Sequence, residues 1–458
     1  MSSASQLSQS VATLARSFSG QLLMPGASGY DEARRVHNGL IDKHPALIAR
    51  CHGAADVADA VKLGRDLGLE IAVRGGGHNV AGKATVEDGL MIDLAAMTGM
   101  AVDPRAKTAT GQGGVTWGLF NRETQIHGLA TTGGLISTTG IAGLTLGGGI
   151  GWLMSKHGLA LDNLTAVQLV TAEGRHVNAS AAENPDLFWA VRGGGGNFGV
   201  ATALEYRLHE VGPMVYGGIT AHPIGMAREV LRLFRDFTAA LDDETGALCA
   251  LTHAPDGSGT PIVALLAGHF GAVDKGEAAL RPVKAFGPPI IDAIGPVPYS
   301  AMNTMLDAGY PKGGLNYWKS GFLGDLSDEA IATAIDCFAR CPTPMGAVIF
   351  EHLHGQVTRV GATGTAFPHR AAGYNMLILG QWMNPAESEQ CTGWARQSYA
   401  SLRSFMRDSC YVNYMGDDEA EGALQSAYGP NLARLRQIKA KYDPDNIFHL
   451  NQNIRPAA

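Results

Sequence analysis

The chain has few charged residues: Asp, Glu, Lys and Arg make up 17% of its 458 residues, with a formal net charge of −7. Proteins that bind nucleic acid or anionic membranes carry an excess of positive charge, so this composition predicts neither partner. The sequence also lacks a run of ~20 apolar residues that could span a bilayer, and residues 1–20 do not resemble a signal peptide. We expect a soluble, cytoplasmic protein, and the sequence leaves its oligomeric state open.

Cysteine is scarce as well, with six residues scattered between positions 51 and 410. No CxxC pair occurs, and Cys337 and Cys341 have no second pair or histidine nearby that would complete a zinc site. Scattered thiols without such spacing are typical of a reduced protein. We therefore expect mostly buried, reduced cysteines and no metal site.

Glycine, in contrast, is abundant: the chain has 60, roughly twice the usual share of ~7%. These glycines gather in clusters instead of repeating at a fixed interval, which excludes a collagen-like or low-complexity chain. Clustered glycines permit tight turns and let main-chain N–H groups approach a ligand closely. The pattern therefore indicates backbone loops gathered around a ligand.

The first cluster, residues 74–79 (RGGGHN), follows the apolar run 69–73, which we predict to be a strand. Three glycines allow a tight turn that presents several N–H groups to an anion, and Arg74 would add a positive charge. His78 then stands at the mouth of a phosphate-binding loop. Because a lone histidine is more often structural, a role for His78 depends on agreement from other segments.

Two further glycine-rich segments follow. Residues 131–151 combine main-chain amides with threonine hydroxyls, which suits an extended, flat, polar ligand such as a pyrophosphate joined to a ring. Residues 194–199 match the GxGxxG fingerprint, but in a dinucleotide-binding domain that motif follows a strand and opens a helix. Here a predicted helix over 186–191 precedes it and a predicted strand over 200–208 follows, so a nicotinamide enzyme is only a remote alternative.

Alternating helix and strand signals predict an α+β protein. We predict an N-terminal ligand-binding domain over residues 1–210, built from two subdomains, 1–97 and 98–210. The glycine clusters thin out over residues 211–408, which we predict to form a second domain. Residues 409–458 are turn-rich and are predicted to return to the first domain.

The predicted second domain mixes strands with helices that begin and end at recognisable signals. Strands are expected over 262–270, 346–354 and 374–382, and helices over 227–241 and 328–337. Such a mixture predicts an antiparallel sheet backed by helices, which would cover one side of the ligand site.

Taken together, the glycine-rich and C-terminal segments resemble the berberine-bridge-enzyme-like branch of the vanillyl-alcohol-oxidase flavoproteins. The resemblance covers about 25–210 and 405–458, and it is weaker between 212 and 400, where members of the family differ in substrate. It implies a two-part PCMH-type FAD-binding domain and a substrate domain. It also implies an FAD-dependent oxidase that takes hydride from a C–H next to O or N of a small, secondary-metabolite-like substrate and passes the electrons to O2. The segments that carry the resemblance are 74–79, 137–152, 162–164, 183–200, 411–414 and 442–453.

The resemblance also implies roles for single residues. His78 matches the histidine that bonds covalently to the 8α position of FAD. Many relatives attach the flavin a second time through a cysteine, but here Ile136 stands at that position, so a single histidyl bond is implied. The other residues that match contacts to FAD are Arg74, Gly75, Gly76, Gly77, Asn79, Thr138, Thr139, Gly140, Gly143, Gly147, Gly148, Ile150, Asn197, Gly199, Val200, Asn413, Asn451 and Asn453.

Candidate catalytic residues lie in two segments. Tyr411 belongs to a Tyr-x-Asn motif in which alcohol oxidases of the family keep a tyrosine base, and strand-like alternation would put Tyr411 and Asn413 on one side. A packed aromatic residue is an equally good interpretation of Tyr411. Alternation likewise puts His352 and His354 on one face of their strand and Glu351 on the other.

The two histidines would line the substrate pocket, bind the substrate, tune the electronic properties of the flavin, or form a structural pair. His369, Tyr374, Asn375 and Trp382 are further candidates for the pocket wall. Two other functions stay open at this point: a flavin dehydrogenase that uses an acceptor other than oxygen, and a flavoprotein that binds a ligand without turnover.

Overall fold

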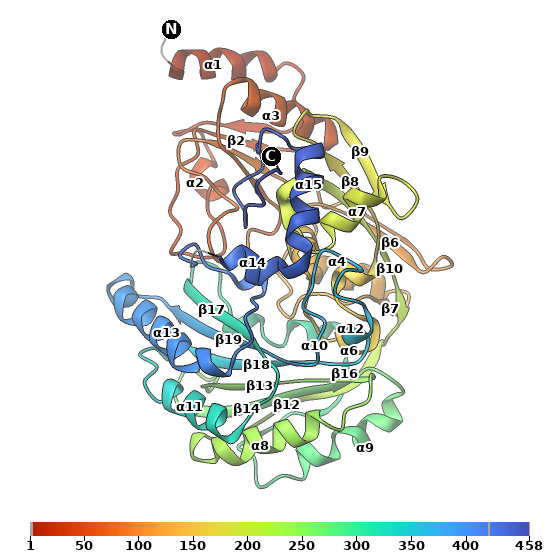
Figure 1. Cartoon of the computed structure of the whole chain (residues 1–458), viewed down its shortest axis with the longest axis vertical. Helices are drawn as coiled ribbons and strands as arrows, with labels where there is room; N and C mark the ends of the chain where they lie inside the picture. Colours follow the sequence, from red (N-terminus) through yellow and green to blue (C-terminus); the bar gives the residue numbers. More distant parts are fainter. Residues whose placement is uncertain (1–2, 420–421, 458) are drawn as a thin grey trace.

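The computed structural model describes residues 3–419 and 422–457. Figure 1 shows the first two hundred residues at one end of the molecule, together with the last two helices. The middle of the chain forms a large sheet at the other end, with helices on its outer side. The predicted α+β fold with an antiparallel sheet backed by helices is confirmed.

The first sheet has the strand order β1-β2-β4-β3, and its last three strands run parallel. Helix α3 connects β2 to β3, buries Val57 and Val61 against the sheet, and stops at Gly68, whose φ of 63° favours glycine. The glycine turn at 75–77 begins where β3 ends. The elements are α1 (Ser3–Leu14), β1 (Gln21–Leu23), α2 (Tyr30–Ala33), β2 (Leu47–Arg50), α3 (Ala54–Asp66), β3 (Ile71–Arg74) and β4 (Leu90–Asp93).

The second sheet is antiparallel, with the order β5-β6-β10-β8-β9. The GxGxxG segment forms η2 between α7 and β10, so the inverted order predicted for it is confirmed. The elements are β5 (Met100–Asp103), β6 (Thr108–Gln112), α4 (Trp117–Gln125), α5 (Ile141–Gly147), α6 (Met154–His157), η1 (Ala160–Asn163), β8 (Leu164–Val170), β9 (His176–Ser180), α7 (Pro185–Val191), η2 (Gly195–Phe198) and β10 (Val200–Arg207), beside the small pair β7 (Leu129–Ala130) and β11 (His209–Glu210).

The third sheet is the largest, with the order β15-β12-β14-β13-β18-β19-β17, and β16 pairs with β12. Helices α8, α9, α11 and α13 cover its outer face (Figure 1), where Phe234, Phe350 and Met376 are buried in one apolar core. The strands are β12 (Met214–Pro223), β13 (Thr245–His253), β14 (Pro261–His269), β15 (Ile291–Asp292), β16 (Gly295–Pro298), β17 (Leu315–Leu323), β18 (Ala347–Leu353) and β19 (Gly373–Trp382).

The helices of this region begin close to the predicted positions. Ser327 caps α11, since its side chain accepts a hydrogen bond from the Ala330 N–H, as a cap residue should. The elements are η3 (Ile224–Met226), α8 (Ala227–Thr238), α9 (Val273–Lys284), α10 (Tyr299–Thr304), η4 (Asp307–Gly309), α11 (Asp328–Phe338), α12 (Gln356–Arg359), η5 (Pro385–Glu387), α13 (Ser388–Leu402) and η6 (Arg403–Phe405).

The C-terminal segment packs back onto the first two sheets (Figure 1). The buried ammonium of Lys439 donates to Asp443 Oδ2 at 2.6 Å and to the carbonyls of Asn197 and Phe448 at 2.7 and 2.9 Å. A buried charge is tolerated only when it is paired and hydrogen-bonded in this way. Lys439 therefore holds the final segment against η2. The elements are η7 (Val412–Tyr414), α14 (Ala423–Tyr428), η8 (Gly429–Asn431) and α15 (Leu432–Tyr442).

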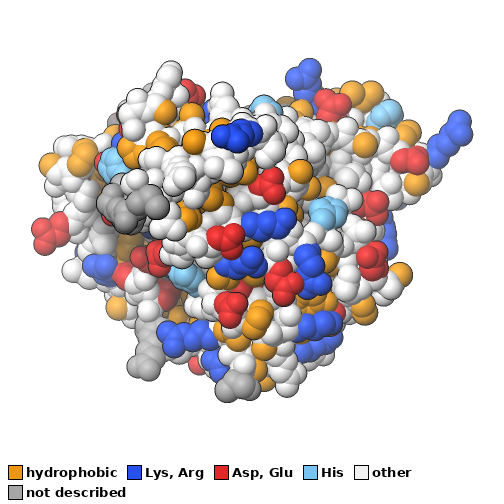
Figure 2. All heavy atoms as spheres, turned by 90° about the horizontal axis from the view of Figure 1, so that it is seen from above, with side chains coloured by type: hydrophobic (Ala, Val, Ile, Leu, Met, Phe, Trp, Pro, Cys, Tyr) orange, Lys and Arg blue, Asp and Glu red, His pale blue; other side chains and the backbone are white. Residues whose placement is uncertain are grey.

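The described residues include no helix that is both long enough and apolar enough to cross a membrane. On the face shown in Figure 2, positive and negative side chains are interspersed, without a broad field of one sign. The six cysteines are all unpaired.

Candidate active site

His78 lies directly after the glycine turn at the end of β3. Its Nε2 is 2.9 Å from Thr138 Oγ1, its Nδ1 is 3.4 Å from Thr139 Oγ1, and its ring stacks on His37 with the centroids 4.0 Å apart. Burial, together with the nearby His37, lowers the pKa of His78 to about 3. The imidazole is therefore neutral at pH 7 and has a free lone pair, which a nucleophile requires.

Two glycines bring the segments of His78 and Thr138 together. A Cβ atom on Gly76 would overlap the Gly140 nitrogen, and a Cβ atom on Gly140 would overlap the Gly76 nitrogen. Only glycine permits this backbone-to-backbone approach. Gly77, with a φ of 73°, adds the left-handed turn that places His78 beside the two threonines. The prediction that separate glycine clusters meet is confirmed for these two segments.

Arg74 does not present its charge to the glycine turn as expected. Its Nε and Nη2 each donate to the carboxylate of Asp93 at 2.9 Å, and Nη1 donates to the carbonyls of Ala33 and Arg35. Asp93 lies directly opposite Arg74 on the neighbouring parallel strand and is completely buried, so it needs a cationic partner. An anion at the turn would therefore be held by main-chain N–H groups and not by this guanidinium.

The remaining glycines and asparagines have features that fit FAD. Gly143 and Gly196 are exposed, with open space around them, so their main chain can be approached closely. Asn451 Oδ1 and Asn453 Oδ1 are buried but have no hydrogen-bond partner among the described residues. Unpaired buried acceptors are costly unless a ligand or water donates to them. These oxygens are therefore available to a ligand, and contact of Asn451 and Asn453 with FAD stays a prediction.

Asn197 and its neighbours make contacts within the protein through their side chains. Asn197 Nδ2 donates to the carbonyls of Gly194 and Gln452 at 2.8 and 3.2 Å, and its Oδ1 accepts from the Ile454 N–H at 2.9 Å. The side chain of Asn197 thus connects η2 to the C-terminal segment. Gly199 and Val200 have no free polar side chain, so only the main chain of these residues is available to a ligand. Asn79, on the His78 loop, accepts a hydrogen bond from the Lys83 N–H at 3.1 Å.

Tyr411 is buried with its hydroxyl at the glycine turn that follows α5. The hydroxyl oxygen accepts hydrogen bonds from the N–H groups of Gly149 and Ile150 at 2.9 and 3.4 Å, and from Asn413 Nδ2 at 2.9 Å. Burial raises the pKa of Tyr411 to about 12 in spite of these donors. The segment after Tyr411 is the 3-10 helix η7 and not a strand, so the predicted alternation is wrong, although Tyr411 and Asn413 do touch.

Close packing against the same turn places both residues of the Tyr-x-Asn motif. A Cβ atom on Gly147 would overlap the Asn413 amide oxygen, and a Cβ atom on Gly148 would lie 2.8 Å from the Tyr411 ring. Asn413 Nδ2 also donates to the Leu144 carbonyl at 3.0 Å. The motif and the glycine cluster at 147–150 therefore form one unit, although they are far apart in the sequence.

Glu351 is the ionisable residue that sequence reasoning did not select. Its Oε1 accepts a hydrogen bond from the Tyr414 hydroxyl at 3.0 Å, and its Oε2 accepts one from Asn375 Nδ2 at 2.6 Å. Burial raises the pKa of Glu351 to about 7, and the two hydrogen bonds only partly oppose this rise. The sequence did contain a signal for Glu351: an acidic residue follows the apolar residues 347–350 in a central strand. A buried carboxylate is costly there unless it has a function.

Aromatic side chains surround this carboxyl group. The ring of Tyr414 meets Tyr411 edge-on at 4.9 Å and Trp318 at 5.6 Å between centroids. The charge of Glu351 also acts on Tyr310, which is partly buried. This low-polarity enclosure accounts for the raised pKa of Glu351, because there is little water to solvate the charged form. Asn375, predicted as part of the pocket wall, is the only one of the four further candidates that contacts Glu351.

His352 and His354 lie on the opposite face of β18 from Glu351. Their rings stack at 4.5 Å, and His352 also contacts Tyr374, whose hydroxyl lies 2.8 Å from Thr238 at the end of helix α8. The predicted shared face is thus correct, but that face is the one that the helices cover. The structure does not bring the two histidines to Tyr411, but His352 lines a small cavity together with Glu351 and Ile150, so the interpretations of the pair all stay predictions.

Comparisons with known proteins show the family to which the chain belongs. A family profile described as "FAD binding domain" matches residues 45–180, and one described as "Berberine and berberine like" matches residues 410–455. The chain is 34% identical to (R)-6-hydroxynicotine oxidase of Paenarthrobacter nicotinovorans over 452 residues, which cover 96% of this chain and 97% of that protein.

Solved structures show the same fold over nearly the whole chain. The structure of 6-hydroxy-D-nicotine oxidase from Arthrobacter nicotinovorans matches with a TM-score of 0.86 at 30% identity, covering 96% of this chain and 99% of that one. Glucooligosaccharide oxidase from Acremonium strictum, described with a 6-S-cysteinyl, 8α-N1-histidyl FAD, matches with a TM-score of 0.87 at 24% identity, covering 98% and 99%. The chain belongs to the berberine-like family of FAD-linked oxidoreductases.

Proposed function

We propose that this protein is an oxidase that takes hydride from a C–H next to O or N of a small molecule and passes the electrons to O2. The observation that carries the proposal is the buried carboxyl of Glu351, hydrogen-bonded to Tyr414 in an enclosure of tyrosines beside Tyr411. The chemistry that FAD supplies when bound is hydride acceptance and transfer of electrons to the final acceptor. The chain itself must bind the substrate and manage its proton.

Glu351 is the base that accepts the proton of the substrate O–H or N–H in this proposal. A base works best when its pKa lies near the working pH, and burial brings the pKa of Glu351 to about 7. The hydrogen bonds from Tyr414 and Asn375 hold both carboxylate oxygens in place. Tyr411 is a weaker candidate, because its pKa of about 12 keeps its proton bound at neutral pH. Its hydroxyl instead positions the glycine turn at 147–150.

We also propose that a single covalent bond through His78 attaches the flavin. Support comes from the neutral imidazole at the glycine turn and from Ile136, which cannot form the second, cysteinyl attachment described for the glucooligosaccharide oxidase. Acid precipitation of the purified protein should leave the yellow colour in the pellet, whereas His78→Ala should release it all. A natural protein that releases all its flavin into the supernatant would refute the tether.

The experiment that tests the function is anaerobic bleaching of the bound flavin by a panel of alcohols, amines, sugars and phenols, followed by admission of O2. We expect one class to bleach the flavin and oxygen to restore the colour, with consumption of one O2 per turnover. Glu351→Gln should keep the flavin but lower kcat/KM about 10²–10⁴-fold, the usual contribution of a general base. Recovery only with a dye acceptor would indicate a dehydrogenase, and spectral change without bleaching would indicate ligand binding alone.

A further inference from the structure

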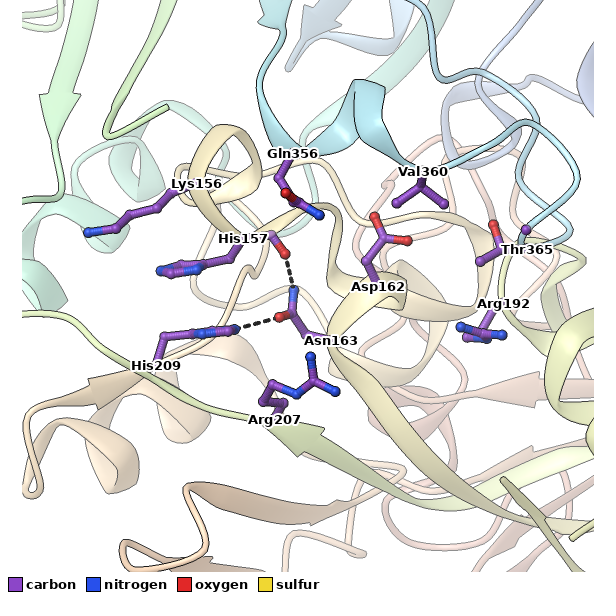
Figure 3. A pocket seen from close by; sticks show the side chains of 11 residues that line it. Lys156, His157, Asp162, Asn163, Arg192, Arg207, His209, Gln356, Val360 and Thr365 are labelled. Atoms are coloured by element: carbon purple, nitrogen blue, oxygen red, sulfur yellow. Dashed lines mark hydrogen bonds between the residues drawn. The ribbon is translucent and has the colours of Figure 1, made fainter. Parts of the chain in front are cut away.

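A cavity of about 290 Å3 lies between the FAD-binding part of the chain and helix α12 (Figure 3). Among the described residues that line it, none is an expected flavin contact, and neither Tyr411 nor Glu351 reaches it. Its wall is rich in nitrogen-bearing side chains: Lys156, His157, Arg192, Arg207 and His209. In Figure 3, the two histidines lie at one side of the cavity, Arg192 at the other, and Arg207 between them.

The negative charge in the wall is already compensated. Asp162 is the one carboxylate among the lining residues, and both its oxygens accept hydrogen bonds from Arg370, at 2.7 and 2.9 Å. Oδ2 of Asp162 also accepts from the Leu159 N–H at 2.9 Å. A fork-to-fork pair of this kind satisfies the carboxylate. Asp162 therefore forms its ion pair with Arg370 and none with the other cations of the cavity.

Two guanidinium groups in the wall have no ion pair among the described residues. Arg192 donates from Nε to the Phe188 carbonyl at 3.3 Å and stacks over the Phe188 ring, and its two terminal nitrogens have no further partner in that part of the chain. The side chain of Arg207, exposed at the end of β10, makes no hydrogen bond or ion pair with the described residues either. Lys156, by contrast, is paired with Glu244 at 3.0 Å. The cavity thus keeps two uncompensated positive charges.

Two stacked histidines form one side of the same wall. His157 Nε2 has no hydrogen-bond partner among the described residues, and the His157 ring stacks on His209 with centroids 3.7 Å apart and planes 8° apart. The arrangement is held by Asn163, whose Nδ2 donates to the carbonyls of His157 and Leu159, both at 3.0 Å. Its Oδ1 must then accept from His209 Nε2, 2.7 Å away, which fixes the tautomer of His209.

We propose that this cavity binds a small oxyanion of the phosphate or carboxylate class, held by Arg192, Arg207 and His157. Guanidinium groups match such anions in charge and in planar geometry, and a ring N–H of His157 would complete the site. Gln356, also in the wall, adds a neutral donor from the other part of the chain. A bound anion would therefore connect the FAD-binding part to the large-sheet part and stabilise both.

The test uses the purified, flavin-loaded protein at constant ionic strength, titrated separately with inorganic phosphate and with citrate. We expect saturable heat of binding and a rise of the thermal midpoint with ligand concentration, as for any ligand that binds only the folded state. Saturation by phosphate alone identifies a phosphate site, and saturation by citrate alone identifies a carboxylate site; either result supports the proposal. Absence of saturable binding by both anions overturns it.

Variants then locate the binding. Arg207→Gln should lower the affinity for the anion at least fivefold. Arg228→Gln, at another exposed arginine, on α8, should leave the affinity unchanged. His157→Asn provides an independent variant on another element if Arg207→Gln folds poorly. Binding that is unaffected by both cavity variants, or weakened equally by the α8 control, would place the anion elsewhere and overturn the proposal.

Discussion

Replacing Glu351 by glutamine tests the buried carboxyl, because the two side chains have nearly the same shape and only glutamate can ionise. Burial raises the pKa of Glu351 to about 7 from an ordinary value of 4.5. The folded protein therefore binds this proton more tightly than the unfolded chain, and stability is lost as the pH rises from 4.5 towards 7. At ~1.4 kcal/mol per tenfold change in proton affinity, ionisation of Glu351 lowers the free energy of unfolding by about 3 kcal/mol at pH 8 but by only about 1 kcal/mol at pH 5.

Glutamine does not ionise, so Glu351→Gln should not lose this stability. We expect its free energy of unfolding, relative to that of the natural protein, to rise by about 2 kcal/mol between pH 5 and pH 8. Asn375 can accommodate the new amide, since its Oδ1 is buried without a partner among the described residues and would accept from the glutamine after a flip. The assay is urea unfolding of both proteins at the two pH values, at equal flavin content. Glu183→Gln, at an exposed carboxyl, controls for the substitution itself. An advantage that does not change with pH, or that shrinks as the pH rises, would refute the reasoning.

Three further predictions concern the rest of the site. Gly140→Ala should abolish flavin incorporation, because its Cβ would overlap the facing backbone, whereas Gly393→Ala, on α13 with open space around it, should incorporate flavin normally; absorbance of the purified proteins decides between them. Tyr414→Phe removes a donor that favours the charged form of Glu351, so the pKa of Glu351 should rise and the ascending limb of the kcat/KM profile should move to higher pH; an unmoved limb contradicts the assignment of the base. Lys439→Met leaves its buried carboxylate partner unpaired and should cost about 3–5 kcal/mol in unfolding free energy by denaturant titration; a loss below about 1 kcal/mol would show that the pair is dispensable.

Local sequence patterns predicted the elements of the FAD-binding part well. The end of helix α3 before Gly68 and the helix-then-strand order around residues 194–199 both appear in the structure near the predicted positions. These features depend on neighbours within a few residues, such as a left-handed glycine or a short apolar run. Single-residue roles predicted from the family resemblance, above all the covalent tether at His78, stay predictions that the flavin assay decides.

Contacts between distant segments were harder to predict from the sequence. Alternation along β18 indicated that His352 and His354 share a face, but not which face helix α8 and its neighbours would cover. Because the helices cover the histidine face of β18, Glu351 and not the histidines lies beside Tyr414. Alternation failed for Tyr411, because a 3-10 turn follows it.

The sequence by itself determined the class of the protein: clustered glycines indicated backbone loops around a ligand, and the resemblance of these segments and of the C-terminal motif to a flavoprotein family implied an FAD-linked oxidoreductase, since such motifs are local. Only the tertiary structure decided where charges are compensated. Asp93 on the next strand neutralises Arg74, while Arg192 and Arg207 keep no counterion in the described part of the chain. The physical reason is that a side chain's partner is set by the register and packing of other elements, and no pattern within its own segment records them.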